Sequence, residues 1–389
     1  MAGDHDHTHE HADDHTHGKT SPHYYGGQAV IEGVMMRGAR TWAIAVRRPS
    51  GDVYLERHPV SDFPQRHPLF AKPLFRGMFA LVDAMSIGTR ALTISANQSV
   101  DESEQLSGKA MGGSLVFALL LFVGVFIVLP NVGLAALREP LGGGNSVLYH
   151  VVEGIVRMGI FLLYLSAISL LADIRRVFMY HGAEHKTIAA WENGEVLTPE
   201  NVAKYSTLHV RCGTNFLLMV MLIAIVTYTL AGVIVPGPDG GWLATAGYHI
   251  GLRIVLLPVV AGLAYEGLRI GAGKDNIIVR ALMKPGLWLQ MITTKPPTDD
   301  QIEIAIRSFE AVVPSADLDG RTHEHLPSTV VWGPDEAVEA VGLAKMPDLP
   351  AEVTGEPIGP PAARAQVAEG GSAPPRAHVA EGGSAIQDE

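Results

Sequence analysis

Residues 213–235 read GTNFLLMVMLIAIVTYTLAGVIV, an apolar stretch without a single charged side chain. At 1.5 Å per residue, a helix of this length crosses a hydrocarbon core of about 30 Å. Residues 111–137 are equally free of charge, and 47% of the whole chain is hydrophobic while only 18% is charged. Uncharged windows of this length are typical of transmembrane helices. The sequence therefore predicts a polytopic, mainly α-helical membrane protein.

Three other apolar segments carry charges. Residues 147–172 contain Glu153 and Arg157, which lie four apart and neutralise each other on one helix face. Residues 250–270 are interrupted by charged residues and a proline, and residues 74–92 by three charges. We expect 74–92 to lie on the membrane surface or to re-enter it, rather than to cross it. The predicted spans, about four in number, are 111–137, 147–172, 213–235 and 250–270.

The distribution of Lys and Arg predicts the orientation. These residues gather before the first span, between the second and third, and after the fourth, whereas the two other loops contain only Arg138. The positive-inside rule then places both termini on the cytoplasmic side of a multi-pass protein of the cell membrane. Its partner is the lipid bilayer. We expect no nucleic-acid partner. The net charge of −11 comes largely from the tails and carries little information about protein partners, which the sequence does not identify.

The chain divides into five parts by composition. Residues 1–23 are rich in His, Asp and Glu, which predicts disorder and weak binding of transition metals. This metal binding is either functional or incidental to the composition. Residues 24–109 form a cytoplasmic module, in which 43–48 and 53–57 flank a Pro-Ser-Gly-Asp turn as a β-hairpin. The membrane domain follows at 110–295, with a cytoplasmic loop at 173–212.

The last two parts are an amphipathic helix and a tail. Ile302, Ile306, Phe309 and Val313 share one face of a helix predicted within residues 296–345. Residues 346–389 are rich in Pro, Ala and Gly and contain a short polar unit twice, which predicts a disordered tail.

The sequence His181-Gly-Ala-Glu-His185 is the candidate chemical motif. It has the form H-x-x-E-H, the reverse of the zinc-binding H-E-x-x-H motif. Residues four apart share a helix face, so both imidazoles can reach one metal ion. Glu184 beside them is a candidate general base. A motif with three fixed letters also arises by chance, and the alternative is a juxtamembrane helix end with polar side chains.

A second group of candidate ligands comes just before the third span. His209 and Cys212 lie three apart at the predicted cytoplasmic face, and both are zinc ligands by type. Four ligands, namely His181, His185, His209 and Cys212, would close a structural site, whereas three would leave a catalytic position open. Arg211 is a candidate for stabilising an oxyanion. Zinc is the expected cofactor, although another divalent transition metal is possible.

Several stretches resemble the YqhQ-like family of bacterial integral membrane proteins. They are Gly26 to Gly38, Tyr180 to Lys186, His209 to Thr214, Pro285 to Gln290, and Thr293 with Thr294. The family has no assigned function and is described as comprising predicted metal-dependent enzymes. The resemblance implies that His181, Glu184, His185, His209, Arg211 and Cys212 are signature residues, and it implies no substrate.

The sequence leaves three hypotheses for the function. The first is a zinc-dependent membrane hydrolase, with a peptidase as one option, in which Glu184 is the base and Arg211 an auxiliary catalytic residue. The second is a non-enzymatic protein of metal handling or transport. The third is a scaffold in which a closed zinc site ties the cytoplasmic loop to the membrane helices.

Overall fold

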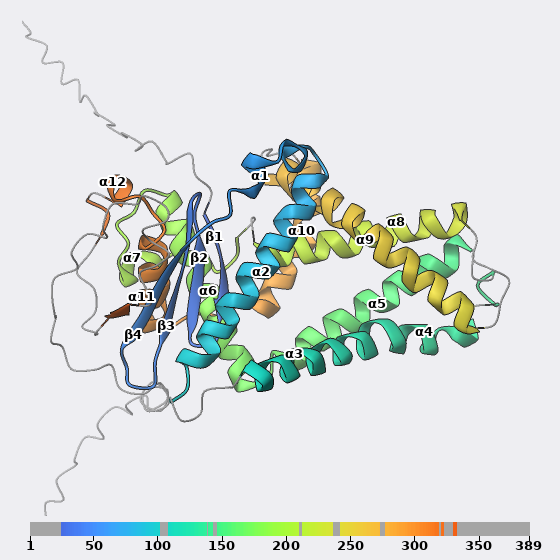
Figure 1. Ribbon diagram of the computed structural model, residues 1–389, viewed down its shortest axis with the longest axis horizontal. Helices are drawn as coiled ribbons and strands as arrows, with labels where there is room; N and C mark the ends of the chain where they lie inside the picture. Colours follow the sequence, from blue (N-terminus) through green and yellow to red (C-terminus); the bar gives the residue numbers. More distant parts are fainter. Residues whose placement is uncertain are drawn as a thin grey trace, which may run out of the picture.

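The computed structural model describes residues 25–101, 108–137, 139–142, 146–209, 212–235, 242–272, 277–318, 320–322 and 330–332. A layered α/β part lies at one end of the molecule, and long apolar helices extend from it (Figure 1). The predicted tails, 1–23 and 346–389, lie outside the described residues.

The α/β part is built on one small sheet. Its strands are β1 (Gly26–Val30), β2 (Gly33–Arg37), β3 (Thr41–Arg47), β4 (Val53–Pro59) and β5 (Val330–Trp332), in that spatial order. The first four pair antiparallel, and β5 runs parallel to β4. The predicted hairpin is confirmed as β3 and β4. The glycine-punctuated stretch before it adds β1 and β2, which the sequence analysis did not resolve as separate strands.

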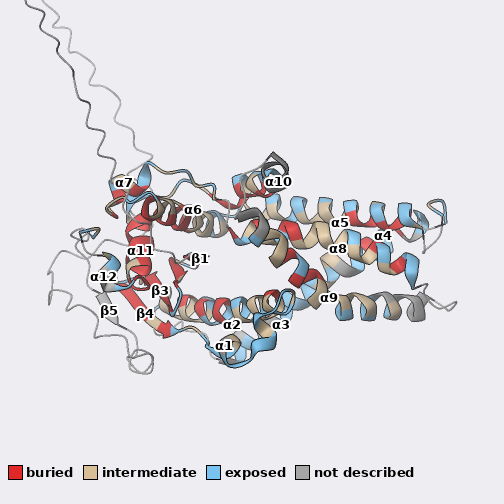
Figure 2. Cartoon of the chain, turned by 90° about the horizontal axis from the view of Figure 1, so that it is seen from above, coloured by how far each residue is buried: buried red, intermediate tan, exposed pale blue. Residues whose placement is uncertain are grey.

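The sheet is covered by helices on both faces because its strands are apolar on both. Ala43 and Ala45 belong to one hydrophobic cluster with α6 (Ala172–Glu192) and α11 (Asp299–Glu310). Ile44 and Val46, which alternate with them, belong to a second cluster with α2 (Phe75–Gln98). Side chains point alternately to opposite faces of a strand, so β3 contributes to both layers. Buried residues concentrate in this part of the molecule (Figure 2).

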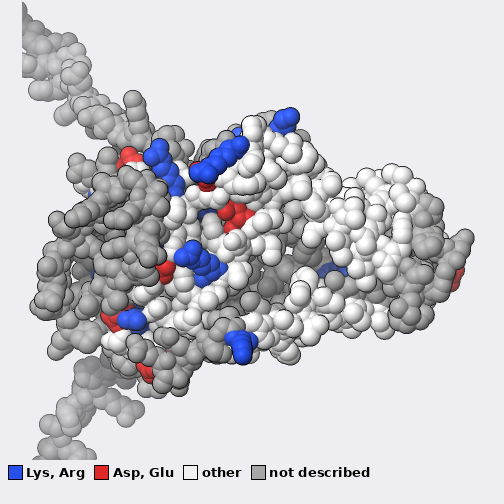
Figure 3. Space-filling view, in the orientation of Figure 1, with Lys and Arg blue, Asp and Glu red and all other residues white. Residues whose placement is uncertain are grey.

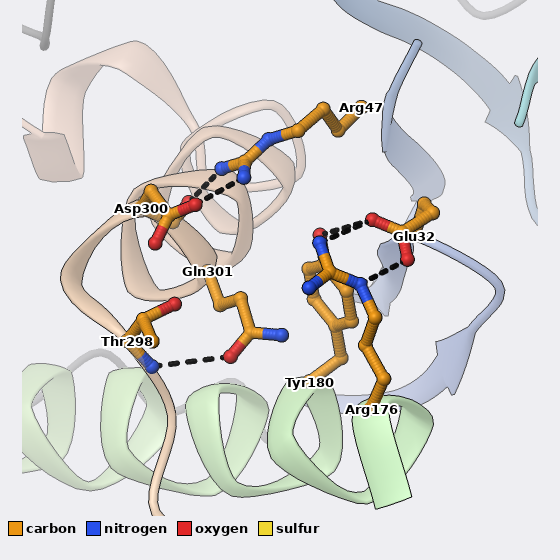
Figure 4. A network of polar contacts seen from close by, with 7 residues as sticks. All are labelled: Glu32, Arg47, Arg176, Tyr180, Thr298, Asp300 and Gln301. Carbon is orange, nitrogen blue, oxygen red and sulfur yellow. Dashed lines mark hydrogen bonds and ion pairs between the residues drawn. The ribbon is translucent and has the colours of Figure 1, made fainter. Parts of the chain in front are cut away.

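The amphipathic helix predicted near residue 300 is confirmed as α11. A capping box between Thr298 and Gln301 defines its N-terminus. Asp300 in its first turn forms an ion pair with Arg47, whose side chain is almost fully buried in the sheet (Figure 4). Carboxylates in the first turn of a helix also interact favourably with its dipole. These contacts fix α11 against the sheet.

The turn between β1 and β2 is fixed by α6. Glu32 in this turn has a φ of 52°, in the left-handed region that costs a non-glycine residue about 1–2 kcal/mol. Its carboxylate accepts hydrogen bonds from Arg176 of α6, at 2.7 Å, and from the hydroxyl of Tyr180, at 3.3 Å (Figure 4). These bonds offset the backbone cost and attach β1 to the helix that carries the H-x-x-E-H motif.

Four described helices are long and apolar enough to cross a membrane: α2, α5 (Val147–Ile168), α8 (Gly213–Ile234), and residues 250–269 of α9 (Trp242–Ala272). The last three correspond to predicted spans. The first predicted span, 111–137, is a helical run in several pieces: α3 (Gly108–Val123), the π-helix η3 (Gly124–Val128), α4 (Leu129–Gly133) and the 3-10 helix η4 (Ala135–Leu137). Large apolar side chains on these helices are exposed, as expected for lipid contact.

Helix α2 connects the two parts of the molecule. Its Ile87 and Ala91 pack against the sheet, and its Asp83 pairs with Arg37 of β2 at 2.6 Å. At its other end, Arg76 pairs with Glu266 of α9. Although α2 has the length and composition of a span, it packs along the sheet and crosses the ends of the apolar helices (Figure 1). Its position along the membrane surface therefore remains a prediction.

The remaining elements are short or lie beside these layers. The predicted loop 173–212 is largely helical, since it contains α6 and α7 (Pro199–Ala203). Helix α10 (Ile277–Thr293) packs against α8 and leads into α11. The others are α1 (Phe63–Arg66), the 3-10 helix η1 (Pro68–Ala71) and α12 (Ser315–Leu318).

Candidate metal centre

The two histidines of the H-x-x-E-H motif lie one turn apart on α6. Their ring centroids are 4.4 Å from each other. Because α6 is a regular helix through this point, the spacing of four residues places both imidazoles on one side, as the sequence predicted. His185 is buried, and His181 is partly exposed.

Cys212 joins these histidines from a distant part of the chain. It is the N-cap of α8, and its Sγ lies 3.2 Å from Nε2 of His181. One ligand atom each from His181, His185 and Cys212 lies within 4.8 Å of the others. At zinc bond lengths of about 2.0–2.3 Å, such ligand atoms can surround one ion with small adjustments. The predicted meeting of these three residues is therefore present.

Backbone carbonyls set the tautomers of both histidines. Nδ1 of His181 lies 2.8 Å from the carbonyl oxygen of Thr293, and Nδ1 of His185 faces the carbonyl oxygen of Thr207. A carbonyl oxygen only accepts hydrogen bonds, so each Nδ1 must carry the proton and donate it. The lone pair is then on Nε2, which is the arrangement found in metal-binding histidines whose other ring nitrogen donates to a carbonyl oxygen.

Burial favours the neutral forms of His185 and Cys212. Among the described residues, Nε2 of His185 is buried without a hydrogen-bond partner. Burial lowers the pKa of His185 to about 2, which keeps the imidazole neutral. Burial also raises the pKa of the Cys212 thiol, against hydrogen bonds from Thr214 that lower it. A cation bound here would accept the lone pair of the neutral His185 imidazole and would stabilise the thiolate form of Cys212.

The glycine of the motif allows two other segments to approach α6. A Cβ on Gly182 would lie 2.2 Å from the carbonyl oxygen of Lys295 and 3.2 Å from a methyl carbon of Thr207. The segment around Thr207 is also attached by Lys186, whose amino group donates to the carbonyl of Ala203 at 2.6 Å. The close approach brings the carbonyl of Thr207 to His185.

Glu184 lies next to the three candidate ligands but is not a member of their group. Its side chain is buried, and the backbone N–H of Gly27 in β1 donates a hydrogen bond to it. Burial raises the pKa of Glu184 to about 8, while the nearby His181 lowers it and Cys212 raises it further. In the described part of the chain, its Oε2 has no hydrogen-bond partner. A buried carboxyl with a pKa near neutrality is typical of catalytic acids and bases.

Of the other two predicted residues, the structure describes only His209. His209 is not part of the three-residue group: its Nε2 lies 3.4 Å from a carboxylate oxygen of Glu192, and its ring centroid lies 5.7 Å from that of His185. Its backbone is held by the side chain of Gln290, which exchanges two hydrogen bonds of 2.8 Å with it. Arg211 lies outside the described residues.

The donor set fits zinc. Two imidazole nitrogens and one thiolate are ligands that zinc binds in proteins, and three protein ligands leave a fourth tetrahedral position. The unpartnered Nε2 of His185 and the fixed Nδ1–H tautomers are what such a site requires before the ion binds.

Comparison with known proteins assigns the chain that carries this centre to a family. A family described as "Protein of unknown function (DUF1385)" matches residues 72–315, well over half of the chain. The chain belongs to this family. The DUF1385 match includes α6 with its motif, Cys212 and α10. No solved structure matches the chain.

One curated relative of this DUF1385 protein is the "Uncharacterized protein YqhQ" of Bacillus subtilis (strain 168). It is 34% identical over 307 residues, which cover 75% of this chain and 93% of that protein. The resemblance stated from the sequence is confirmed. The relative carries no described activity, so the argument for a function rests on the geometry of the site.

The residues that support the candidate ligands were not predicted from the sequence. Thr207 and Thr293 act through backbone carbonyls, which no sequence pattern reveals. Thr293, Gly27 and Gln290 fall in stretches that carried the family resemblance, so that resemblance was the available signal for them. Glu192, which no motif in the sequence singled out, lies beside His209.

Proposed function

We propose that this protein is a zinc-dependent hydrolase of the cell membrane, and that peptides are its substrates. The observation that carries the proposal is the orientation of His181 and His185. Both donate Nδ1–H to backbone carbonyls and direct Nε2 toward a space shared with Cys212. A cation bound by both Nε2 atoms and by Sγ of Cys212 would explain this orientation of the two rings.

The number of ligands favours catalysis over a structural role. Three protein ligands leave a position for substrate, whereas a structural zinc site is usually closed by four. His209 lies beside Glu192, which supports a site with three protein ligands rather than four. Zinc bound there would supply Lewis acidity to a carbonyl group.

Glu184 is the proton acceptor of this proposal. Its buried carboxyl group, raised in pKa to about 8, lies close enough to His181 and Cys212 for each to shift that pKa. It would take a proton from the attacking water and return it to the leaving amine, the roles that suit a group with a pKa near neutrality. The hydrogen bond from Gly27 would hold the carboxylate in place.

The orientation in the membrane belongs to the same proposal. The positive-inside rule places the α/β part, and with it both chain termini and the metal centre, in the cytoplasm. The thiol of Cys212 would then lie in a reducing compartment, where it stays available as a ligand.

The experiment is a comparison of metal content and turnover in the purified full-length protein. Elemental analysis should find about one zinc per chain beyond what weak chelators remove from the N-terminal tail. Glu184→Gln should keep that zinc and lower hydrolysis of a fluorogenic peptide library by about 10²–10⁴-fold. Glu195→Gln is the matched control, because Glu195 bonds Tyr205 away from the site. Equal turnover by the wild type and Glu184→Gln would contradict the proposed base.

A further inference from the structure

A cavity of about 140 Å³ lies between the apolar helices, away from the metal centre. It is lined by α5, α8 and α9, and its polar lining residues are His150, Glu153, Arg157, Tyr228, Thr229 and Arg253. On the face drawn in Figure 3, basic atoms show within the otherwise uncharged helical region. A cavity of this size is too small for a drug-sized ligand and suits a few waters or one small polar group.

The cavity has an excess of positive charge. Glu153 is the one carboxylate among its lining residues, and its Oε1 accepts hydrogen bonds from both Arg157, at 2.7 Å, and Arg253, at 2.6 Å. Its Oε2 lies 3.5 Å from Nδ1 of His150. The neighbour of this oxygen is therefore an imidazole and not a second carboxyl group. Two guanidinium groups therefore share one carboxylate.

This imbalance is costly at such a depth. Glu153 and Arg157 lie six and ten residues along α5 from its start at Val147, or about 9–15 Å inward. An uncompensated charge within a bilayer is energetically unfavourable, and ionisable residues in spans usually face a partner or a functional cavity. A neutral cluster would need a second anion.

Among the described residues, the hydrogen-bond donors of the cavity exceed the acceptors that face them. Arg157 donates to Glu153 and to the carbonyl of Phe126 in the π-helix η3. Arg253 donates to Glu153 through one nitrogen and lies over the ring of Tyr228, although a guanidinium has five donors. The hydroxyl of Thr229 is buried and, within the described part of the chain, has no partner. The donors therefore outnumber the acceptors.

We propose that this cavity binds one small oxyanionic group, a phosphate or a carboxylate, held by Arg157 and Arg253. Guanidinium groups bind such oxyanions through paired hydrogen bonds. The hydroxyl of Thr229 supplies a neutral donor. The group arrives either as a free ion or as the headgroup of an anionic lipid. This assignment is independent of the proposed hydrolase activity.

The test measures ligand binding to the purified full-length protein in detergent. One arm titrates inorganic phosphate by calorimetry, and the other measures retention of phosphatidylglycerol against phosphatidylcholine by native mass spectrometry. Arg253→Gln should weaken binding of the preferred ligand by at least about tenfold. Arg269→Gln is the matched control, since Arg269 is an exposed arginine at the other end of α9. Binding of phosphate alone indicates a free ion, and selective retention of phosphatidylglycerol indicates a headgroup.

A second variant separates binding from folding. Glu153→Gln removes the competing carboxylate, so it should strengthen binding of the same ligand by about tenfold, a gain that a folding defect does not produce. The proposal is overturned if neither probe binds the wild type, or if Arg253→Gln binds like the wild type. Unchanged or weakened binding in a folded Glu153→Gln variant also overturns it, and the charged cluster is then a contact between helices only.

Discussion

Nε2 of His181 lies 3.2 Å from Sγ of Cys212, although the two residues are separated by 31 positions and lie on different helices. One comes from the α/β part, and the other is the N-cap that directly precedes the apolar helix α8. The contact therefore joins the two parts of the molecule at the point where the candidate ligands meet.

Cys212→Ser tests this contact. The change keeps the size of the side chain but replaces a soft thiolate by a hydroxyl, which zinc binds poorly. We expect the zinc affinity to fall by at least about 100-fold, and cobalt-substituted protein to lose its sulfur-to-metal absorption band. Retention of that band would show that the thiol is not a ligand. Thr214→Ser serves as the control, because Thr214 contacts the sulfur without belonging to the ligand group.

Gly182→Ala should disturb the centre without removing a ligand. The added methyl group meets the carbonyl of Lys295 at 2.2 Å, so the segment that precedes α11 must move. We expect a loss of about 1–3 kcal/mol of stability and weaker metal binding, because Thr207, which orients His185, is also displaced. Gly213→Ala is the matched control, since open space surrounds a Cβ there, beside Cys212. Similar metal binding and stability in both variants would contradict the role given to Gly182.

Gln290→Ala should destabilise the junction between α10 and α8. The side chain is fully buried, bonds both backbone groups of His209, and donates to Asn215 at 3.1 Å. Its removal leaves buried polar groups without partners, at a cost of about 1–3 kcal/mol. Thermal unfolding in detergent measures the effect. Met291→Ala, at an exposed position of the same helix, should change the midpoint far less.

Asp300→Asn should reduce the sensitivity of the protein to acid. Although burial opposes it, the neighbouring Arg47 lowers the pKa of Asp300 below the usual 3.8. A carboxyl whose pKa is lower in the folded state stabilises the fold above its unfolded pKa, and this contribution is lost as the pH falls through the folded pKa. The variant should unfold at lower temperature than the wild type at pH 7, and the difference should shrink below about pH 4. A constant difference from pH 7 to pH 3 would argue against this ion pair.

The local features of this protein were predictable from its sequence. Three spans, the hairpin of β3 and β4, and helix α11 follow from hydropathy and periodicity over neighbouring residues. The two short strands β1 and β2 were not resolved, because their glycines weaken a strand pattern that the sheet register and the packing of α6 then stabilise.

The apolar stretch at residues 213–235 and the spacing of His181 and His185 were determined by the sequence alone, since a helix fixes both the length of a span and the alignment of residues four apart. The tertiary structure decided which distant residues complete the centre. Only the folded chain brings Cys212 and the carbonyls of Thr207 and Thr293 to these histidines, and only packing places His209 beside Glu192 instead. The set of residues around the two histidines depends on contacts between segments far apart in the chain. A pattern of neighbouring residues carries no information about such contacts.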